Sequence, residues 1–189
     1  MEIKFCSACG AEMEARIPED DDHVRAVCTS CSHVHYENPK LVVGCLPLWE
    51  NKILMCKRNI EPRKGKWTLP AGYLENGESV QDGAARETLE ETRARVRIIA
   101  PYRMFNIVYV HQVYLMFLAQ METAQFGPTP ESTEVRLFDP EAIPWDDIAF
   151  EVIRQTLEDY LQDRDSLSPA RAFCIKDLEF PRKFTGKTG

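Results

Sequence analysis

The sequence predicts an α+β domain preceded by a small cysteine-rich module. Strand-like and helical segments do not alternate strictly between residues 39 and 165, which favours α+β over a doubly wound parallel sheet. Residues 1–38 hold four of the seven cysteines, arranged as two Cys-x2-Cys pairs. Residues 166–189 have a weaker apolar pattern, and we expect them to form a C-terminal tail. The 189 residues therefore divide into a module, one domain and a tail.

Charge and composition exclude several classes of protein. The chain has 23 Lys and Arg against 30 Asp and Glu, a net charge of −7, which is unlike a general polyanion binder. A small phosphate-bearing substrate remains compatible, because acidic side chains bind phosphate through a divalent metal. The N-terminus lacks a secretory signal, and no apolar run approaches the ~20 residues of a membrane span. We expect a cytoplasmic protein without a membrane partner.

Four cysteines near the N-terminus have the spacing of a two-knuckle zinc site. They are Cys6, Cys9, Cys28 and Cys31. Four thiolates complete a closed tetrahedral shell, so we expect a structural Zn²⁺. A site in which His33 or His35 replaces one cysteine, a set of core cysteines and a redox pair are the alternatives. Residues 1–40 carry four basic and eight acidic residues, and this net charge of −4 opposes contact with nucleic acid.

Apolar patterns give the order of elements in the domain. Residues 41–49 and 52–58 predict a β-hairpin, and residues 67–69 a short strand before a proline. Residues 79–93 predict a helix, followed by strands at 95–100, 102–109, 113–121 and 135–138. Residues 122–132, which contain glycine and prolines, predict a loop, and residues 146–163 a second helix.

The first helix has a recognisable start. Ser79 followed by Asp82 forms a capping box, so the helix begins there. Ala85, Leu89 and Thr92 share one side at helical spacing, and we expect that side to pack on the sheet.

Three carboxylates lie on another side of the same helix. Glu87, Glu90 and Glu91 stand at i, i+3 and i+4, a spacing at which like charges destabilise a helix by ~0.2–0.5 kcal/mol per pair. A divalent cation would offset this repulsion, and oxygen ligands select magnesium or manganese. The alternative is a solvated glutamate face paired with nearby arginines.

The segment from residue 72 to 91 reads Gly72-x5-Glu78-x7-Arg86-Glu87-x2-Glu90-Glu91. This pattern resembles the Nudix box, the signature of the Nudix hydrolase superfamily. It departs from the box at Thr88, where an aliphatic residue is usual, and at Arg93, where a glycine normally ends the helix. The resemblance implies the Nudix fold, a mixed β-sheet sandwiched by helices. It also implies hydrolysis that depends on Mg²⁺ or Mn²⁺.

The resemblance also implies a role for each residue of the box. Glu87 and Glu91 would be the main metal ligands, with Glu90 a third. Arg86 would pair with Glu78 and brace the loop. The backbone carbonyl of Gly72, or of Ala71, would also touch the metal.

Three residues outside the box complete the predicted site. In similar enzymes a glutamate from a later loop completes the site or acts as the base. Glu131 and Glu134 are the candidates, and Glu134 is preferred because it immediately precedes a strand. Arg58, at the end of the hairpin, would contact phosphate, for which its planar fork is suited. A surface role is the alternative for each. For Trp67 and Phe138, core packing is preferred over stacking on a base.

The order of a four-cysteine ribbon followed by the box resembles one type of Nudix enzyme. This type includes bacterial NADH pyrophosphatases and a plant chloroplast enzyme that acts on FAD and ADP-ribose. The run Trp67-Thr-Leu-Pro-Ala-Gly-Tyr-Leu-Glu75 and Pro130-Glu-Ser132 carry the likeness. It implies cleavage of a nucleoside diphosphate linked to another moiety, of the FAD, ADP-ribose or NADH class, releasing a nucleoside monophosphate. A non-catalytic nucleotide sensor and an RNA-binding protein of the decapping type are the alternatives. Family analogy also implies a homodimer.

Overall fold

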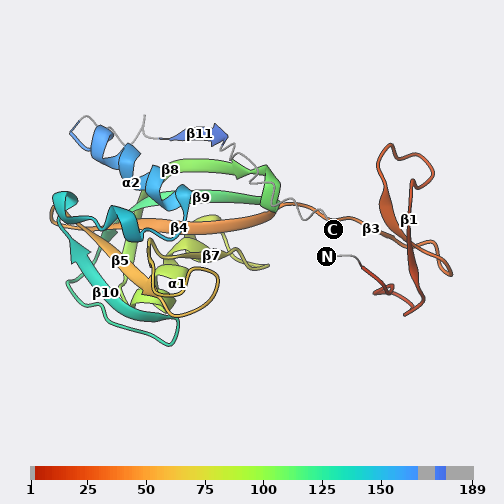
Figure 1. The fold of residues 1–189 in the computed structure, drawn as a ribbon, viewed down its shortest axis with the longest axis horizontal. Helices are drawn as coiled ribbons and strands as arrows, with labels where there is room; N and C mark the ends of the chain where they lie inside the picture. The colour runs from red at the N-terminus through yellow and green to blue at the C-terminus, as the bar shows by residue number, and fades with distance from the viewer. Residues whose placement is uncertain (1–2, 166–172, 178–189) are drawn as a thin grey trace, which may run out of the picture. The chain divides into compact units, whose positions relative to one another are not determined.

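The computed structural model describes residues 3–165 and 173–177 and separates the chain into two compact units, residues 1–39 and 40–189. The smaller unit is a three-stranded antiparallel sheet in the order β1-β2-β3 (Figure 1). Its strands are β1 (Met13–Arg16), β2 (Arg25–Cys28) and β3 (Val34–His35). No helix among the described residues is long and apolar enough to cross a membrane.

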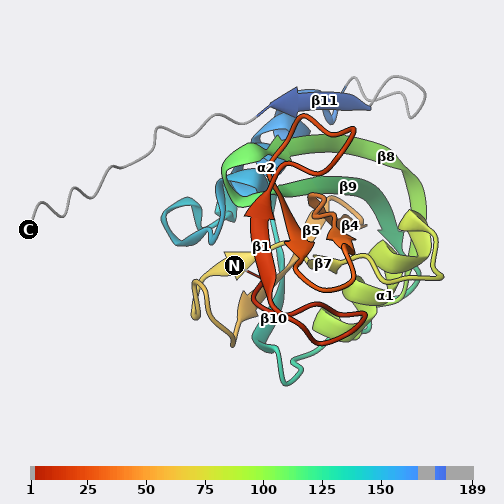
Figure 2. The same ribbon diagram turned by 90° about the vertical axis from the view of Figure 1, so that its right-hand side faces the viewer.

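The larger unit is built on a mixed sheet in the order β10-β5-β4-β9-β8-β11, with β6 paired to β5 and β7 paired to β4. The pairs β4–β9 and β8–β11 are parallel and the others antiparallel. Figures 1 and 2 both show β8 and β9 side by side. The strands are β4 (Lys40–Trp49), β5 (Lys52–Arg58), β6 (Trp67–Thr68), β7 (Ala71–Tyr73), β8 (Val96–Ile107), β9 (Gln112–Met121), β10 (Ser132–Phe138) and β11 (Cys174–Asp177).

Two helices cover opposite faces of this sheet (Figure 1). They are α1 (Val80–Thr92) and α2 (Glu151–Asp163), and three short 3-10 turns are η1 (Val108–Val110), η2 (Pro140–Ala142) and η3 (Trp145–Asp147). Side chains alternate along β4, so Val43 packs in the cluster that contains Ala84 of α1. Leu46 instead packs in the cluster that contains Leu157 of α2. The predicted α+β class and the sheet between helices are confirmed.

Strand β4 changes its partner halfway along its length. Its first half pairs with β7, Gly44 opposite Ala71, while its end pairs with β5, Leu48 opposite Ile53. A Cβ at Gly44 would lie 2.5 Å from the Cβ of Ala71, so only glycine allows this approach. The predicted hairpin is therefore confirmed, but β4 and β5 pair only near its turn. Beyond it β5 pairs with β6 and β10.

Two predicted boundaries were wrong. Residues 95–100 and 102–109 form one strand, β8, because Pro101 is accommodated where the register with β9 shifts. The second helix begins at Glu151 and not at residue 146. The chain before it is extended at Ile148, which bridges to Trp67, and the Ala149 N–H donates to the Trp67 carbonyl at 2.8 Å. β7 was not predicted, since three residues give no periodicity.

Helix α1 begins as predicted, with the Asp82 N–H donating to the Ser79 hydroxyl at 3.1 Å. Its predicted packing side was wrong at Leu89, which is 39% exposed. The helix packs instead through small residues, among them Ala84 and Thr88, which bring its backbone close to the sheet. The buried Thr88 hydroxyl donates to the Ala84 carbonyl at 2.8 Å, so it needs no partner outside the helix. Thr92 is buried, as predicted.

Trp67 and Phe138 belong to the core beneath α2. Their ring centroids lie 4.8 Å apart in an edge-to-face arrangement, and both side chains are buried. The preferred core role is confirmed for both residues. The predicted tail, residues 166–189, lies outside the described residues except at 173–177, where β11 pairs with β8.

Arg93 ends α1 in the left-handed conformation, with φ 61°, and its N–H donates to the Leu89 carbonyl at 2.8 Å. The left-handed conformation destabilises a residue that has a Cβ by ~1–2 kcal/mol. Glycine avoids this cost, but its unfolded chain is more flexible, and the larger loss of entropy on folding cancels part of the gain. We predict that Arg93→Gly raises the free energy of unfolding by ~0.5–1 kcal/mol, measured by urea denaturation. Arg93→Ala removes the same side chain but keeps the Cβ, and should give no such gain.

Candidate active site and zinc ribbon

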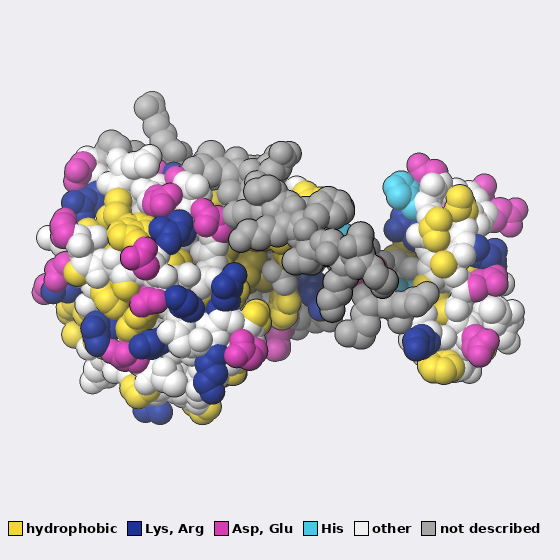
Figure 3. Space-filling model, in the orientation of Figure 1, with side chains coloured by type: hydrophobic (Ala, Val, Ile, Leu, Met, Phe, Trp, Pro, Cys, Tyr) yellow, Lys and Arg dark blue, Asp and Glu magenta, His cyan; other side chains and the backbone are white. Residues whose placement is uncertain are grey.

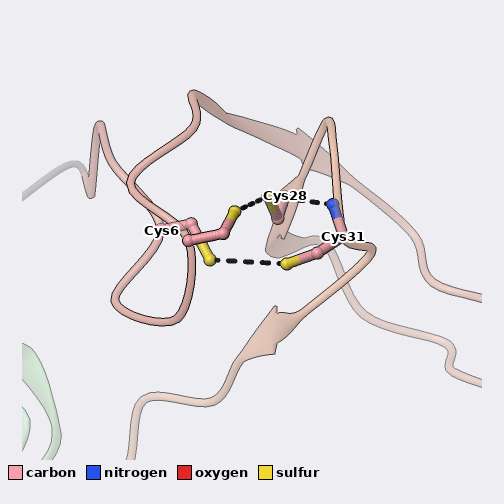
Figure 4. Close-up of side chains that lie close together, drawn as sticks. Cys6, Cys28 and Cys31 are labelled. Carbon is pink, nitrogen blue, oxygen red and sulfur yellow. Dashed lines mark hydrogen bonds between the residues drawn. The ribbon is translucent and has the colours of Figure 1, made fainter.

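The four N-terminal thiols converge on one point, and Figure 4 labels three of the cysteines, Cys6, Cys28 and Cys31. Their sulfur atoms all lie within 4.8 Å of one another, with 3.7 Å between Cys6 and Cys31 and 3.5 Å between Cys9 and Cys28. Sulfurs bound at ~2.3 Å to a tetrahedral Zn²⁺ stand about 3.8 Å apart, so these thiols fit zinc. The group contains neither His33 nor His35. The all-cysteine prediction is therefore favoured by the geometry.

Backbone amides in each knuckle point at the sulfurs. The Cys31 and Ser30 N–H groups each donate to Cys28 Sγ at 3.4 Å, and the Ala8 N–H donates to Cys6 Sγ at 3.4 Å. The Cys31 and Ser30 amides lower the pKa of the Cys28 thiol to about 6. They favour the thiolate, which is the form that binds a metal.

We predict one zinc ion per chain, measured by inductively coupled plasma mass spectrometry. The double variant Cys28→Ser/Cys31→Ser should lose the ion and unfold the ribbon, because binding energy at a structural zinc site is folding energy. Cys45→Ser, which changes a buried cysteine of the other unit, is the matched control and should keep one zinc. A full complement of zinc in the double variant would refute the assignment.

In the larger unit, Arg86 ties the loop before α1 to the helix. Its guanidinium donates twice to Glu78, Nη2 to Oε1 at 2.7 Å and Nε to Oε2 at 2.9 Å. Nη2 also donates to the Tyr73 carbonyl at 3.1 Å, and the Glu75 N–H donates to Glu78 at 2.8 Å. Arg86 holds the pKa of Glu78 down at about 2. The loop is thus fixed to the helix by a bidentate ion pair.

The same guanidinium contacts two of the predicted metal ligands. Its Nη1 lies 2.7 Å from Glu87 and 3.1 Å from Glu90. Glu87 also lies against Gly72, where a Cβ would come within 2.3 Å of the carboxylate carbon. Burial raises the pKa of Glu87, while Arg86 acts in the opposite direction. Gly72 is therefore required for the Glu87 carboxylate to reach its place.

Glu91 is the most buried of the three helix glutamates, with 7% of its surface exposed. Its Oε2 accepts from the Ala71 N–H at 3.1 Å and from the Cys56 thiol at 3.7 Å. Among the described residues it has no ion-pair partner. Burial, reinforced by the charge of Glu87, raises its pKa to about 7. A buried carboxylate without a cation fits a divalent metal.

The three glutamates are not drawn together as closely as the thiols. In the part of the chain that the structure describes, the groups with ligand atoms within 4.8 Å of one another are the four cysteines and a set on an exposed loop, Asp21, Asp22 and His23. Arg86 forms ion pairs with Glu87 and Glu90, so Glu91 is the one of the three helix glutamates that has no ion pair. This arrangement suits Mg²⁺, which binds through one or two carboxylates and substrate phosphates.

These carboxylates line a cavity of about 510 Å³. Its lining includes acidic and basic groups, among them Glu87, Glu90, Glu91, Glu131, Arg58 and Arg86. Tyr73, Tyr114 and Phe150 add aromatic surface. The Arg58 guanidinium lies 5.0 Å from the ring of Phe150, and its Nε donates to the Pro62 carbonyl at 2.9 Å. Arg58 therefore lines the same cavity as the helix glutamates.

The structure reverses our order of preference between the two later glutamates. Glu131 lines the cavity, whereas Glu134 is not among its lining residues. Glu134 pairs instead with Arg136 and, at 3.7 Å, with Lys57. It lies within β10, where side chains alternate between faces, while Glu131 precedes the strand. The geometry therefore offers no support for Glu134.

Sequence reasoning missed the aromatic part of the cavity. Tyr73 directly follows Gly72 in the box, but Tyr114 and Phe150 come from β9 and from the residue before α2. Gln112 of β9, also a lining residue, donates to the Tyr73 hydroxyl of β7 at 2.9 Å, and both strands pair with β4. No spacing pattern in the sequence connects these positions.

Figure 3 shows basic and acidic side chains interspersed on the visible face of the larger unit.

Comparisons with known proteins show the family of this chain. Residues 4–37 match the Nudix N-terminal zinc-ribbon family and residues 38–160 match the NUDIX domain. The chain belongs to the Nudix hydrolase family. Within it, the ribbon places the chain among the members that carry this N-terminal module.

Curated relatives include NAD-capped RNA hydrolases called NudC. Those of Vibrio parahaemolyticus and Stutzerimonas stutzeri are 29% and 30% identical and each match covers 85% of this chain. The matches cover 62% and 57% of those relatives, so the chain spans about three fifths of their length.

Solved structures are also similar to this chain. A NUDIX hydrolase from Nitrosomonas europaea is 50% identical, with a TM-score of 0.87 over 93% of this chain and all of that one. An ADP-ribose pyrophosphatase from Streptococcus suis is 20% identical, with a TM-score of 0.59 over 75% of this chain and all of that one, and shares the fold.

The raised pKa of Glu91 predicts a pH-dependent stability when magnesium and manganese are left out. The folded protein holds this proton up to a pH of about 7, whereas the unfolded chain releases it near 4.5. The folded state binds more protons between these values, so this group's contribution to stability falls as pH rises through the window. Glu91→Gln does not titrate. We predict that wild type loses ~1–3 kcal/mol relative to Glu91→Gln between pH 4.5 and 7.5.

The measurement is urea denaturation of both proteins at several pH values in metal-depleted buffer. Taking the difference between the two proteins removes the contributions of other titrating groups. A difference that stays constant with pH would contradict the assignment. Adding Mg²⁺ at pH 7.5 should restore the stability of wild type more than that of the variant.

Proposed function

We propose that this protein hydrolyses the pyrophosphate bond of a nucleoside diphosphate linked to another moiety, in a reaction that depends on Mg²⁺ or Mn²⁺. The observation that carries the proposal is Glu91, a buried carboxylate without a cationic partner that lines the cavity beside Glu87. A substrate that arrives with its metal supplies the missing cation. The Nudix family match supports hydrolysis as the class of reaction.

The proposed reaction consumes one water molecule. The oxygen of a water molecule bonds to one phosphorus, the bond from that phosphorus to the bridging oxygen breaks, and a nucleoside monophosphate and a phosphorylated partner leave. A bound divalent metal supplies a Lewis acid for the phosphoryl oxygens and lowers the pKa of bound water. Glu87, Glu91 and, more peripherally, Glu90 would hold it.

Other residues of the chain orient the substrate and move the proton. Arg58 lines the cavity without an ion pair to an acidic side chain among the described residues, so its fork is available to a phosphate. Glu131 is the candidate to accept the proton of the attacking water, because its carboxylate is close enough to raise the pKa values of Glu87 and Glu91. Arg86 and Glu78 keep the loop in place, and the Gly72 carbonyl remains a candidate contact.

The proposed substrates are FAD, ADP-ribose and NADH. The aromatic residues of the cavity offer flat surfaces on which a base or flavin could stack. The names of the curated relatives add NAD-capped RNA to the substrates worth testing. We expected no nucleic-acid partner from the acidic ribbon, and an RNA with an NAD cap tests that expectation directly.

The decisive experiment incubates zinc-loaded protein and Mg²⁺ with each of these compounds and with nucleoside triphosphates, and measures nucleoside monophosphate release. We predict release from at least one dinucleotide. Glu91→Gln should lower kcat by about 10²–10³-fold, as expected when charge stabilisation in a catalytic site is removed. Glu134→Gln, also a glutamate but outside the cavity, is the matched control and should stay within about twofold of wild type.

A non-catalytic nucleotide sensor is the competing function. It predicts binding of a nucleotide, measured by calorimetry, with no turnover of any compound in the panel. The retained carboxylates of the box oppose this reading. By family analogy we also propose a cytoplasmic homodimer, for which sedimentation should give about twice the chain mass of 21.7 kDa.

A further inference from the structure

Cys56 lies directly behind the carboxylate of Glu91. It belongs to β5, is 1% exposed and has no counterpart in the roles described so far. Its sulfur is 3.7 Å from Oε2 of Glu91 and 3.8 Å from the carbonyl oxygen of Thr68. Two buried acceptors thus stand within reach of a single S–H.

The same carboxylate oxygen is held from a second side. The Ala71 N–H of β7 donates to Oε2 at 3.1 Å, so β5 and β7 both anchor this one atom. No hydrogen bond to Oε1 is made by any residue that the structure describes. The two anchors therefore divide the carboxylate into an oxygen fixed to the protein and an oxygen left for another ligand.

We propose that Cys56 is a positioning residue for Glu91: its S–H and the Ala71 N–H hold Oε2, and so present Oε1 to the divalent cation. The inference rests on the proposed function through the role of Glu91 as a metal ligand. Cys56 itself touches neither metal nor substrate. It acts by fixing the rotamer of the Glu91 side chain, as outer-shell groups at metal sites fix the ligands that they contact.

The chemistry of the thiol suits this role. An ordinary cysteine thiol is protonated at neutral pH and carries one S–H donor. Between its two acceptors the S–H favours the carboxylate when Glu91 is ionised, because a hydrogen bond to a charged acceptor is the stronger one.

Cys45 provides a matched comparison within the same sheet. It is equally buried, but its thiol donates to the Ala84 carbonyl at 3.4 Å and not to a carboxylate. Substitutions at Cys45 therefore report what the loss of a buried thiol does to packing alone.

The test measures Mn²⁺ binding by electron paramagnetic resonance on zinc-loaded protein without substrate. Cys56→Ala should weaken Mn²⁺ binding about tenfold, the lower end of the range for outer-shell partners. Cys56→Ser keeps a donor at nearly the same place and should bind within about twofold of wild type. Cys56→Val, which fills the space without a donor, should behave like Cys56→Ala and serves if the alanine variant fails to fold. Cys45→Ala should bind Mn²⁺ as wild type does.

Activity provides a second readout. The Mg²⁺ concentration at half-maximal rate should rise about tenfold in Cys56→Ala, with kcat at saturating Mg²⁺ near that of wild type. Wild-type Mn²⁺ binding in Cys56→Ala or Cys56→Val would overturn the inference. Equal weakening in Cys56→Ser and Cys56→Ala would also overturn it, because packing would then explain the effect.

The two proposals fail in different ways. If wild type binds Mn²⁺ but hydrolyses no compound of the panel, the proposed function fails while the Mn²⁺ series still decides the role of Cys56. If Glu91→Gln binds Mn²⁺ as tightly as wild type, Glu91 is not a ligand and the inference about Cys56 falls with that role.

Discussion

The close approach of helix α1 to strands β4 and β7 is the constraint on which the site depends. Two glycines make it possible: Gly44 allows β7 to lie against β4, and Gly72 allows the Glu87 carboxylate to lie against β7. At both positions a Cβ would meet another atom at 2.5 Å or less. Small residues on α1 complete the contact. A larger side chain at any of these places would push the carboxylates away from the cavity they line.

The acidic side chains where α1 meets β4 and β7 differ in whether they contact a cation. Arg86 forms ion pairs with Glu78, Glu87 and Glu90, so each of these three carboxylates contacts a cation, but a single guanidinium leaves most of their negative charge uncompensated. Glu91 has hydrogen bonds but no cation. Burying such a charge is costly, and its raised pKa reflects that cost. A divalent cation is the natural complement of this negative charge.

The opposite face of the sheet is secured by a buried ion pair. Arg103 of β8 donates to Asp159 of α2 at 2.7 Å, and both side chains are almost fully buried. Breaking such a pair by removing one partner costs about 3–5 kcal/mol, because a buried charge is left behind. The pair holds α2 against β8. The residue preceding α2, Phe150, lines the cavity beside Arg58, so the position of α2 also shapes the site.

The sequence alone determined the features that depend on spacing along the chain. The zinc knuckles, the Ser79 cap and the three glutamates of α1 are local patterns, and short-range geometry converts each of them directly into structure. Tertiary structure decided what depends on contacts between distant segments. It ranked the three glutamates by burial, placed Glu131 and not Glu134 at the cavity, and turned Leu89 outward in favour of small residues. It also brought Cys56, Tyr114 and Phe150 to the site from separate elements. These outcomes follow from strand pairing and helix packing, which join residues with no fixed separation in sequence.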